Sequence, residues 1–194
     1  MSKRIPIVAI VGRANVGKSS LFNTLIGRRE AIVAKEAGTT RDNVTAMASY
    51  GGKDFWLVDT AGLKAAEDDF ELGIQQQIIE AAASADVIIV VVEADVPPTA
   101  ADRQGATMAL KSLKPVVLVI NKIDKNKNVS LSDWQRLGIK TVVATSVSQK
   151  TGLEELLDAI SDRLPKASIK TAKDRLRLAL LGRPNVANLR FLTL

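Results

Sequence analysis

The residues best suited to chemistry form a short stretch near the N-terminus, which reads Gly-Arg-Ala-Asn-Val-Gly-Lys-Ser from Gly12 to Ser19. Its spacing, G-x-x-x-x-G-K-S, is typical of a loop that wraps phosphate groups. Glycines at these positions allow backbone conformations and close approaches that a Cβ atom would block. The amides of residues 14–19 can then form an anion-binding nest at the positive end of the following helix. We therefore expect Lys18 to reach the β- and γ-phosphates of a nucleotide, and the Ser19 hydroxyl to bind Mg²⁺.

A second candidate for phosphate and metal chemistry is Asp59-Thr-Ala-Gly62, which ends a predicted strand. The Asp59 carboxylate can hold Mg²⁺ through water beside Ser19, and the bare amide of Gly62 suits an oxygen of the γ-phosphate. Because such a contact exists only before hydrolysis, the segment that follows is expected to act as a switch. Thr39 and Thr40 are both candidates to complete the magnesium shell, and the residues alone do not decide between them.

A third candidate, Asn121-Lys-Ile-Asp124, follows a buried apolar run and can select the base. The Asp124 carboxylate can accept hydrogen bonds from N1–H and the N2 amine of guanine, whereas adenine offers no such pair of donors. Asn121 can tie this loop to the phosphate loop, and the stem of Lys122 can cover the base. Thr145-Ser-Val147 is a weaker match to a loop that backs the base. The expected ligands are therefore GTP and GDP with Mg²⁺.

Composition excludes several other chemistries. The 194 residues contain no cysteine and no histidine, which removes disulfides, thiolate metal sites, cysteine nucleophiles and the usual general base. An apolar fraction of 46% is enough for a real core. No apolar run reaches membrane-spanning length, and the N-terminus lacks the apolar region of a signal peptide. A cytoplasmic protein without a membrane partner is the expectation.

The net charge of +6 belongs to the C-terminal end of the chain. Of the 27 basic and 21 acidic residues, seven basic and one acidic lie in residues 165–194, so residues 1–164 are balanced. A solvated linker explains this charge better than an arm that binds a polyanion, and no DNA partner is expected.

Alternating apolar runs and helical patterns predict an α/β fold. A hairpin is expected around Gly51-Gly52, and the other strands should form a mostly parallel sheet covered by helices on both faces. In such a sheet the phosphate loops lie at the carboxyl ends of the strands. The expected strands are residues 5–11, 44–50, 54–59, 87–92, 115–120 and 141–145, and the expected helices are residues 19–26, 74–83, 99–112, 131–137 and 152–164.

Together these motifs resemble the translation-factor class of GTPases, and within it the bacterial EngA/Der family of tandem-domain ribosome-assembly GTPases. The resemblance covers residues 3–164 and implies a P-loop NTPase fold, a Ras-like G domain over residues 1–164. It also implies GTP hydrolysis and a switch function in assembly of the large ribosomal subunit. The motifs that carry it are Gly12-Arg-Ala-Asn-Val-Gly-Lys-Ser-Ser20, Gly38-Thr-Thr-Arg-Asp42, Asp59-Thr-Ala-Gly-Leu63 and Asn121-Lys-Ile-Asp124.

The resemblance assigns roles to individual residues. It favours Thr40 as the metal ligand, and it implies Lys18, Asn15 and Thr40 for catalysis and Ser19, Thr40 and Asp59 for the metal. Family members usually have Pro at Ala14 and Ala at Val147, and the second change weakens the match of the guanine loop. The implied nucleotide-binding residues are Gly12, Arg13, Ala14, Asn15, Val16, Gly17, Lys18, Ser19, Ser20, Asp59, Thr60, Ala61, Gly62, Leu63, Asn121, Lys122, Asp124, Ser146 and Val147.

Catalytic assistance is a separate question, because Leu63 stands where Ras-like GTPases carry a water-aligning glutamine. We expect slow intrinsic turnover unless another group helps. In the similar potassium-activated GTPases the residue that matches Asn15 helps to hold K⁺, and Arg41 and Asp42 are weaker candidates. Asn15 could instead only tie down loop backbone. One alternative function is a non-hydrolysing guanine-nucleotide-binding remnant, and an ATP-using enzyme is disfavoured by Asp124.

The end of the chain resembles its beginning. Residues 165–174 have the composition of a linker, and residues 175–186 then repeat residues 5–16, as the opening of a second G domain would. Where Gly17-Lys18-Ser19 should recur, the chain reads Ala187-Asn188-Leu189. Deleting one guanine from a coding sequence for residues 17–25 yields the eight residues from Ala187 to Leu194. We therefore expect residues 175–194 to be a truncated, frameshifted start of a second G domain that binds no nucleotide.

Overall fold

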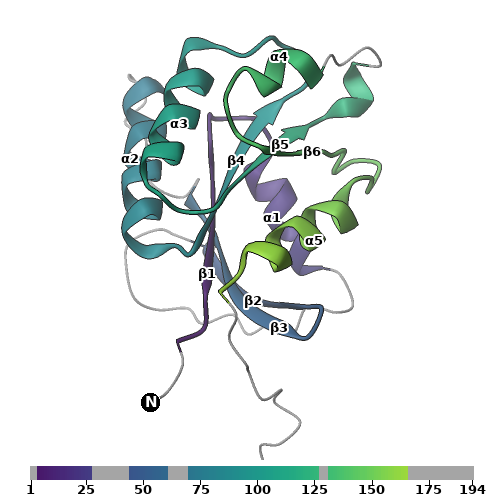
Figure 1. Cartoon of the computed structure of the whole chain (residues 1–194). Helices are drawn as coiled ribbons and strands as arrows, with labels where there is room; N and C mark the ends of the chain where they lie inside the picture. The colour runs from purple at the N-terminus through teal and green to yellow at the C-terminus, as the bar shows by residue number, and fades with distance from the viewer. Residues whose placement is uncertain (1–3, 28–43, 61–69, 127–130, 166–194) are drawn as a thin grey trace, which may run out of the picture.

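The computed structural model describes residues 4–27, 44–60, 70–126 and 131–165, and these residues form an α/β fold (Figure 1). The elements follow the expected order and differ from the expected boundaries by a few residues. The strands are β1 Ile7–Gly12, β2 Val44–Tyr50, β3 Lys53–Asp59, β4 Val87–Glu93, β5 Val116–Asn121 and β6 Thr141–Ala144. The helices are α1 Lys18–Ile26, α2 Phe70–Ser84, α3 Ala100–Lys111, α4 Leu131–Gln135 and α5 Leu153–Arg163, with a 3₁₀ turn at Ile123–Lys125.

The strands form one sheet in the order β2-β3-β1-β4-β5-β6. Every neighbouring pair is parallel except β2 and β3, which form the expected antiparallel hairpin. Gly51 and Gly52 both have positive φ, as the tight hairpin turn that matches strand twist requires. The first strand therefore lies in the middle of the sheet, with β3 on one side and β4 on the other.

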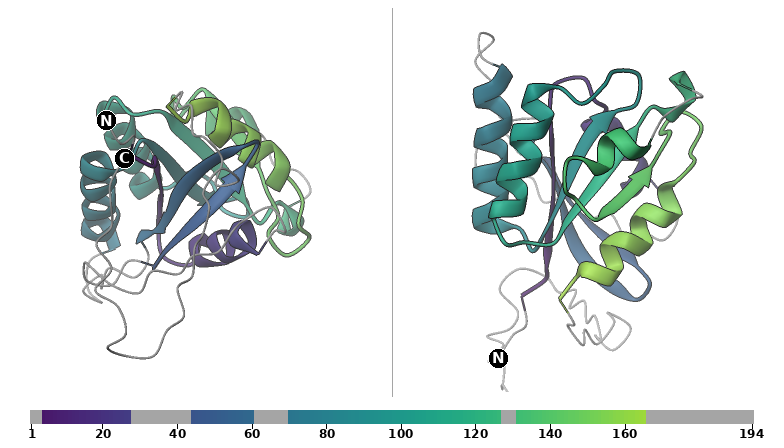
Figure 2. Two further views of the ribbon diagram at one scale, coloured as in Figure 1. Left: turned by 90° about the horizontal axis from the view of Figure 1, so that it is seen from below. Right: turned by 45° about the horizontal axis from the view of Figure 1, so that its top comes forward.

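Helices cover both faces of the sheet, which explains why its inner strands are apolar throughout. Figure 2 shows α2 and α3 side by side on one face and α1 and α5 on the other. Along β1, Val8 and Ile10 face the core beneath α1 and α5, whereas Ala9 and Val11 face the core beneath α2 and α3. The alternation of side chains thus feeds two separate hydrophobic cores from one strand.

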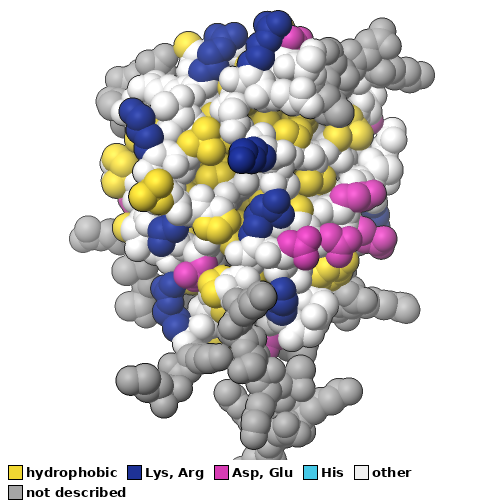
Figure 3. Space-filling view, viewed as in Figure 1, with side chains coloured by type: hydrophobic (Ala, Val, Ile, Leu, Met, Phe, Trp, Pro, Cys, Tyr) yellow, Lys and Arg dark blue, Asp and Glu magenta, His cyan; other side chains and the backbone are white. Residues whose placement is uncertain are grey.

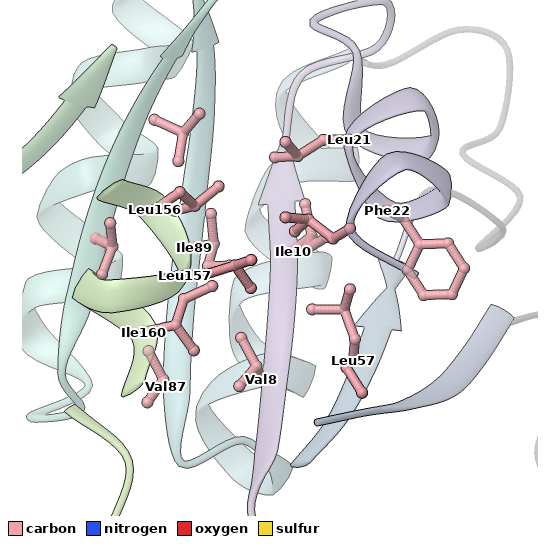
Figure 4. Packing of buried hydrophobic residues seen from close by; sticks show 14 of the residues in the cluster. Val8, Ile10, Leu21, Phe22, Leu57, Val87, Ile89, Leu156, Leu157 and Ile160 are labelled. Atoms are coloured by element: carbon pink, nitrogen blue, oxygen red, sulfur yellow. The ribbon is translucent and has the colours of Figure 1, made fainter. Parts of the chain in front are cut away.

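The core beneath α1 and α5 fixes the helix that opens at the phosphate loop. Leu21 and Phe22 of α1 are buried, and Figure 4 shows them with Ile10 of β1 and Leu57 of β3. On the other side of the same core, the apolar stripe of α5 packs on β1 and β4. The strand before the phosphate loop and the helix after it are therefore both held by buried contacts.

The outer surface of α5 is acidic. Glu154, Glu155, Asp158 and Asp162 are exposed on this helix, and Figure 3 shows acidic side chains gathered where α5 lies. Within the described part of the chain, no helix is long and apolar enough to cross a membrane. The repeat and most of the linker expected from the sequence, residues 166–194, lie outside the described residues.

Candidate functional site

The phosphate loop joins the carboxyl end of β1 to the first residue of α1. Its two glycines are required by close approaches, because both have positive φ and neither has room for a side chain. A Cβ atom on Gly12 would lie 2.4 Å from the Val91 carbonyl oxygen of β4, and one on Gly17 would lie 2.3 Å from Nδ2 of Asn121. The loop is thus seated against the neighbouring strand and against the candidate guanine motif.

Lys18, the first residue of α1, lies folded back over this loop. Its side chain is buried, and Nζ donates hydrogen bonds to the carbonyls of Gly12 at 2.7 Å and Arg13 at 2.6 Å. Burial lowers the pKa of Lys18 to about 8; the Asp59 carboxylate opposes this shift, and the Arg13 guanidinium adds to it. Ser19 and Ser20 follow as exposed residues in the first turn of α1.

Asp59 and Thr60 are buried at the carboxyl end of β3, next to β1. Thr60 Oγ1 donates to the Ile10 carbonyl at 2.7 Å, which anchors the end of β3 to β1. The charge of Asp59 acts on Lys18, so two of the three expected metal ligands, Ser19 and Asp59, lie at the phosphate loop. The expected site residues Thr40, Ala61, Gly62 and Leu63, and the candidates Thr39, Arg41 and Asp42, lie outside the described residues.

The guanine motif is attached to the phosphate loop by two side chains. Asn121 Nδ2 donates to the Val16 carbonyl at 3.0 Å in a buried position, so the expected tie between the two loops is present. Lys122 Nζ donates to the Asn15 carbonyl at 2.6 Å. Because both contacts end on the loop backbone, they join the candidate base site to the candidate phosphate site. Thr145 Oγ1 supports the first contact by donating to Oδ1 of Asn121.

Asp124, the candidate for reading guanine, is positioned by Ser146. The buried Ser146 hydroxyl donates to Oδ1 of Asp124 at 2.5 Å, and this hydrogen bond holds the pKa of the Asp124 carboxyl below its usual range. The carboxylate therefore stays ionised at neutral pH and can accept two donors from a base. Val147, the residue that departs from the family pattern, packs its side chain against the core beneath α1 and α5.

Three polar residues that the sequence did not single out form contacts with the phosphate loop. Asp102 and Glu93 form ion pairs with Arg13, at 2.8 and 3.4 Å. Gln77 of α2 accepts a hydrogen bond from the Gly12 amide at 3.1 Å. Glu93 ends β4, which the sequence marks as a buried strand, but the place of β4 beside β1 becomes visible only in the folded sheet. The helix cap at Thr99 was a usable signal for Asp102, whereas nothing in the sequence distinguishes Gln77 from its neighbours.

Comparison with known proteins agrees with this geometry. A family model described as a 50S ribosome-binding GTPase matches residues 7–122. The chain belongs to this GTPase family. The expected resemblance to the Der proteins is confirmed, because curated relatives at 40–44% identity are named GTPase Der. The relative from Gemmatimonas aurantiaca is 40% identical over 190 residues, which make up 96% of this chain and 43% of the relative. The chain thus spans less than half the length of the curated relatives it matches.

Solved structures place the same residues in a Ras-like G domain. Era, in a complex with MgGDPNP and nucleotides 1506–1542 of 16S ribosomal RNA, is 30% identical with a TM-score of 0.68; the match covers 90% of this chain and 61% of that one. The G domain of the T. maritima FeoB iron transporter is 31% identical with a TM-score of 0.58, covering 82% of this chain and 99% of that one. The expected fold class is therefore confirmed.

Proposed function

We propose that this chain binds GTP and GDP and hydrolyses GTP. The observation that carries the proposal is the pair of contacts from Asn121 and Lys122 to the phosphate-loop backbone, at 3.0 and 2.6 Å. They tie the segment that carries the ionised carboxylate of Asp124 to the proposed phosphate-binding loop. A guanine base joined to a di- or triphosphate fits this arrangement and satisfies the carboxylate, whereas adenine would leave it without donors.

Mg²⁺ is the metal that these residues suit. The donor set is a hydroxyl, Ser19, and a carboxylate, Asp59, and hard oxygen donors of this kind together with phosphate oxygens are the usual magnesium ligands. When bound, the ion neutralises charge on the β- and γ-phosphates. Thr40 is proposed as a further ligand from the family resemblance. Lys18 supplies the protein's own positive charge to the same phosphates.

Competition between nucleotides tests the base assignment. The purified chain should bind fluorescent GDP, which unlabelled GDP but not ADP displaces. Asp124→Asn should weaken GDP binding by about 100-fold or more, because an amide cannot accept both guanine donors. The same variant should gain affinity for xanthosine diphosphate, whose ring carries a carbonyl where guanine has its amine. Equal displacement by ADP, or unchanged GDP affinity in Asp124→Asn, would refute the proposal.

Hydrolysis is tested by multiple-turnover phosphate release. Leu63 predicts slow release, and the resemblance of Asn15 to its counterpart in potassium-activated GTPases predicts faster release in K⁺ than in Na⁺ at equal ionic strength. A chain that binds GTP but releases no phosphate in either salt would instead be the non-hydrolysing remnant.

Ribosome assembly in the cytoplasm is the proposed cellular role. It is supported by the family description as a 50S ribosome-binding GTPase and by the relatives named GTPase Der. Sedimentation with purified 50S and 30S particles, in GDP and in a non-hydrolysable GTP analogue, tests it. Binding to 50S particles that depends on the triphosphate form is the expected result, and no binding in either form would count against this role.

A further inference from the structure

The side chain of Arg13 is paired with carboxylates that lie outside the phosphate loop. Its Nε atom donates to Oδ1 of Asp102 at 2.8 Å, and its terminal guanidinium nitrogen Nη2 lies 3.4 Å from Oε1 of Glu93. The arginine is partly buried, with 20% of its side chain exposed. A residue of the phosphate motif is thus paired with two carboxylates from α3 and from the end of β4.

Asp102 is the fixed end of this arrangement. Only 1% of its side chain is exposed, and its second oxygen, Oδ2, accepts hydrogen bonds from the amide and the hydroxyl of Thr99 at the start of α3. Burying a charge is costly unless it is paired. Among the described residues, the cation that forms an ion pair with Asp102 is Arg13. Arg13 therefore cannot leave without stranding a buried carboxylate.

Glu93 extends the pairing to the guanine motif. Its Oε1 faces Arg13, and its Oε2 accepts from Lys122 Nζ at 2.8 Å. The same Nζ donates to the carbonyl of Asn15. Two cations and two carboxylates thus form a neutral chain from α3, past β4, to the guanine motif. This chain is attached to the phosphate loop at two positions, Arg13 and Asn15.

We infer that Asp102 and Glu93, acting through Arg13 and Lys122, clamp the phosphate loop in its binding conformation. Asn15 has a φ of +65°, in the left-handed region that few residues adopt apart from glycine and, less readily, asparagine. A loop held in that shape before the nucleotide arrives loses less conformational freedom on binding. Arg13 is on this view a positioning residue: its backbone lies in the loop, but its guanidinium is not a phosphate ligand. The inference rests on the proposed guanine-nucleotide binding.

The test is the dissociation rate of fluorescent GDP from the full chain. Arg13→Gln removes the cation. Asp102→Asn keeps an oxygen for the Thr99 donors but turns an amide towards Arg13. Each variant should raise the dissociation rate about tenfold, which corresponds to about 1.4 kcal/mol. Because both changes break the Arg13–Asp102 ion pair, the double variant should be no faster than the faster single variant.

Two control variants separate positioning from general stability. Arg4→Gln removes an arginine at the opposite end of β1, which pairs with Asp86 at 2.8 Å but is 62% exposed. Ile160→Val removes a buried methyl group from α5, which packs on the opposite face of the sheet from α3. Ile160→Val should lower the melting midpoint, and both controls should leave GDP dissociation within about twofold of the wild type.

The outcomes are distinguishable. A wild-type chain that fails to bind GDP refutes the proposed function. Wild-type binding, with GDP dissociation in Arg13→Gln and Asp102→Asn within twofold of the wild type or with additive effects in the double variant, refutes only the clamp. If these variants do not fold, Glu93→Gln decides, because it keeps Asp102 paired. The clamp requires faster GDP dissociation from Glu93→Gln at an unchanged melting midpoint, and an unchanged rate overturns it.

Discussion

Burial and nucleotide binding are expected to have opposite effects on the charge of Lys18. Burial favours the neutral amine, whereas a bound phosphate would favour the ammonium. Its pKa of about 8, compared with 10.5 for an ordinary lysine, shows that burial prevails in the protein as described. A polyphosphate placed beside Nζ should raise this pKa again, because an anion close to a buried amine stabilises the protonated form. Nucleotide binding and protonation of Lys18 are therefore linked.

This linkage predicts proton uptake on GDP binding. The pKa rises on binding, so affinity is fully present below pH 8 and falls as the pH rises above 8, the value in the free protein. At pH 8 about half of the free amines are unprotonated, and binding should take up about 0.5 proton per site. At pH 6.5 uptake by Lys18 should be close to zero. Calorimetry in buffers of different ionisation enthalpy measures both values, and no difference in uptake between the two pH values would contradict the linkage.

At the residue scale, the sequence was informative wherever residue type and spacing together specify chemistry. The lysine, the two glycines and the Asn-Lys-x-Asp motif could be assigned in this way, and the tie from Asn121 to the phosphate loop is present. The partners of Arg13 could not be assigned, because Glu93 and Asp102 lie 80 and 89 residues away along the chain. Only the folded sheet brings them to the phosphate loop. Contacts of this kind depend on strand order, which no local pattern encodes.

At the scale of elements, β1 extends past the end of β3. The last parallel pair joins Ile10 to Asp59, and beyond it β1 still presents a carbonyl at Ile10 and an amide at Gly12. Side chains take over these two groups: Thr60 donates to the carbonyl, and Gln77 of α2 accepts from the amide. Through Gln77, α2 is thus tied to Gly12, the first residue of the phosphate loop.

Replacing Gln77 should therefore destabilise the protein measurably. Gln77→Leu removes the acceptor of a buried amide, and leaving such a donor unpaired costs about 1–3 kcal/mol. Gln76, the preceding residue of α2, is exposed and bonds only within its own helix to Glu80 among the described residues. Gln76→Leu is thus a matched control, expected within about 0.5 kcal/mol of the wild type. Urea unfolding of the three proteins compares them, and equal stability of the two variants would contradict the role of Gln77.

Elements were predictable where one physical pattern dominates. Runs of apolar residues marked β1, β4 and β5, because strands covered on both faces need apolar side chains at every position. Thr99 marked the start of α3, because its hydroxyl caps the first turn. Predictions were least accurate at element ends: α2 begins at Phe70, four residues before the first isoleucine of its apolar pattern. The early turn of that helix carries no periodic signal, so pattern alone could not place it.

At the scale of the whole molecule, the main domain and the basic end of the chain are expected to behave differently. The described residues form a six-stranded sheet with a core on each face, and the phosphate and guanine motifs begin at the carboxyl ends of its inner strands β1 and β5. The repeat at residues 175–186 copies the strand and the first half of the phosphate loop. It lacks a counterpart to Lys18 and to Ser19, which supply the phosphate charge and the metal hydroxyl. A half-loop of this kind should not hold a nucleotide.

The full chain should therefore bind one GDP. Titration calorimetry on the 194-residue protein is expected to give a stoichiometry of about one, because the two groups that fix phosphate and metal occur together only at Lys18 and Ser19. Lys18→Ala provides the decisive control, since it removes the charge from the complete loop and leaves residues 175–194 untouched. It should abolish GDP binding altogether. Two sites in the wild type, or one site remaining in Lys18→Ala, would show that the repeated segment forms a nucleotide site of its own.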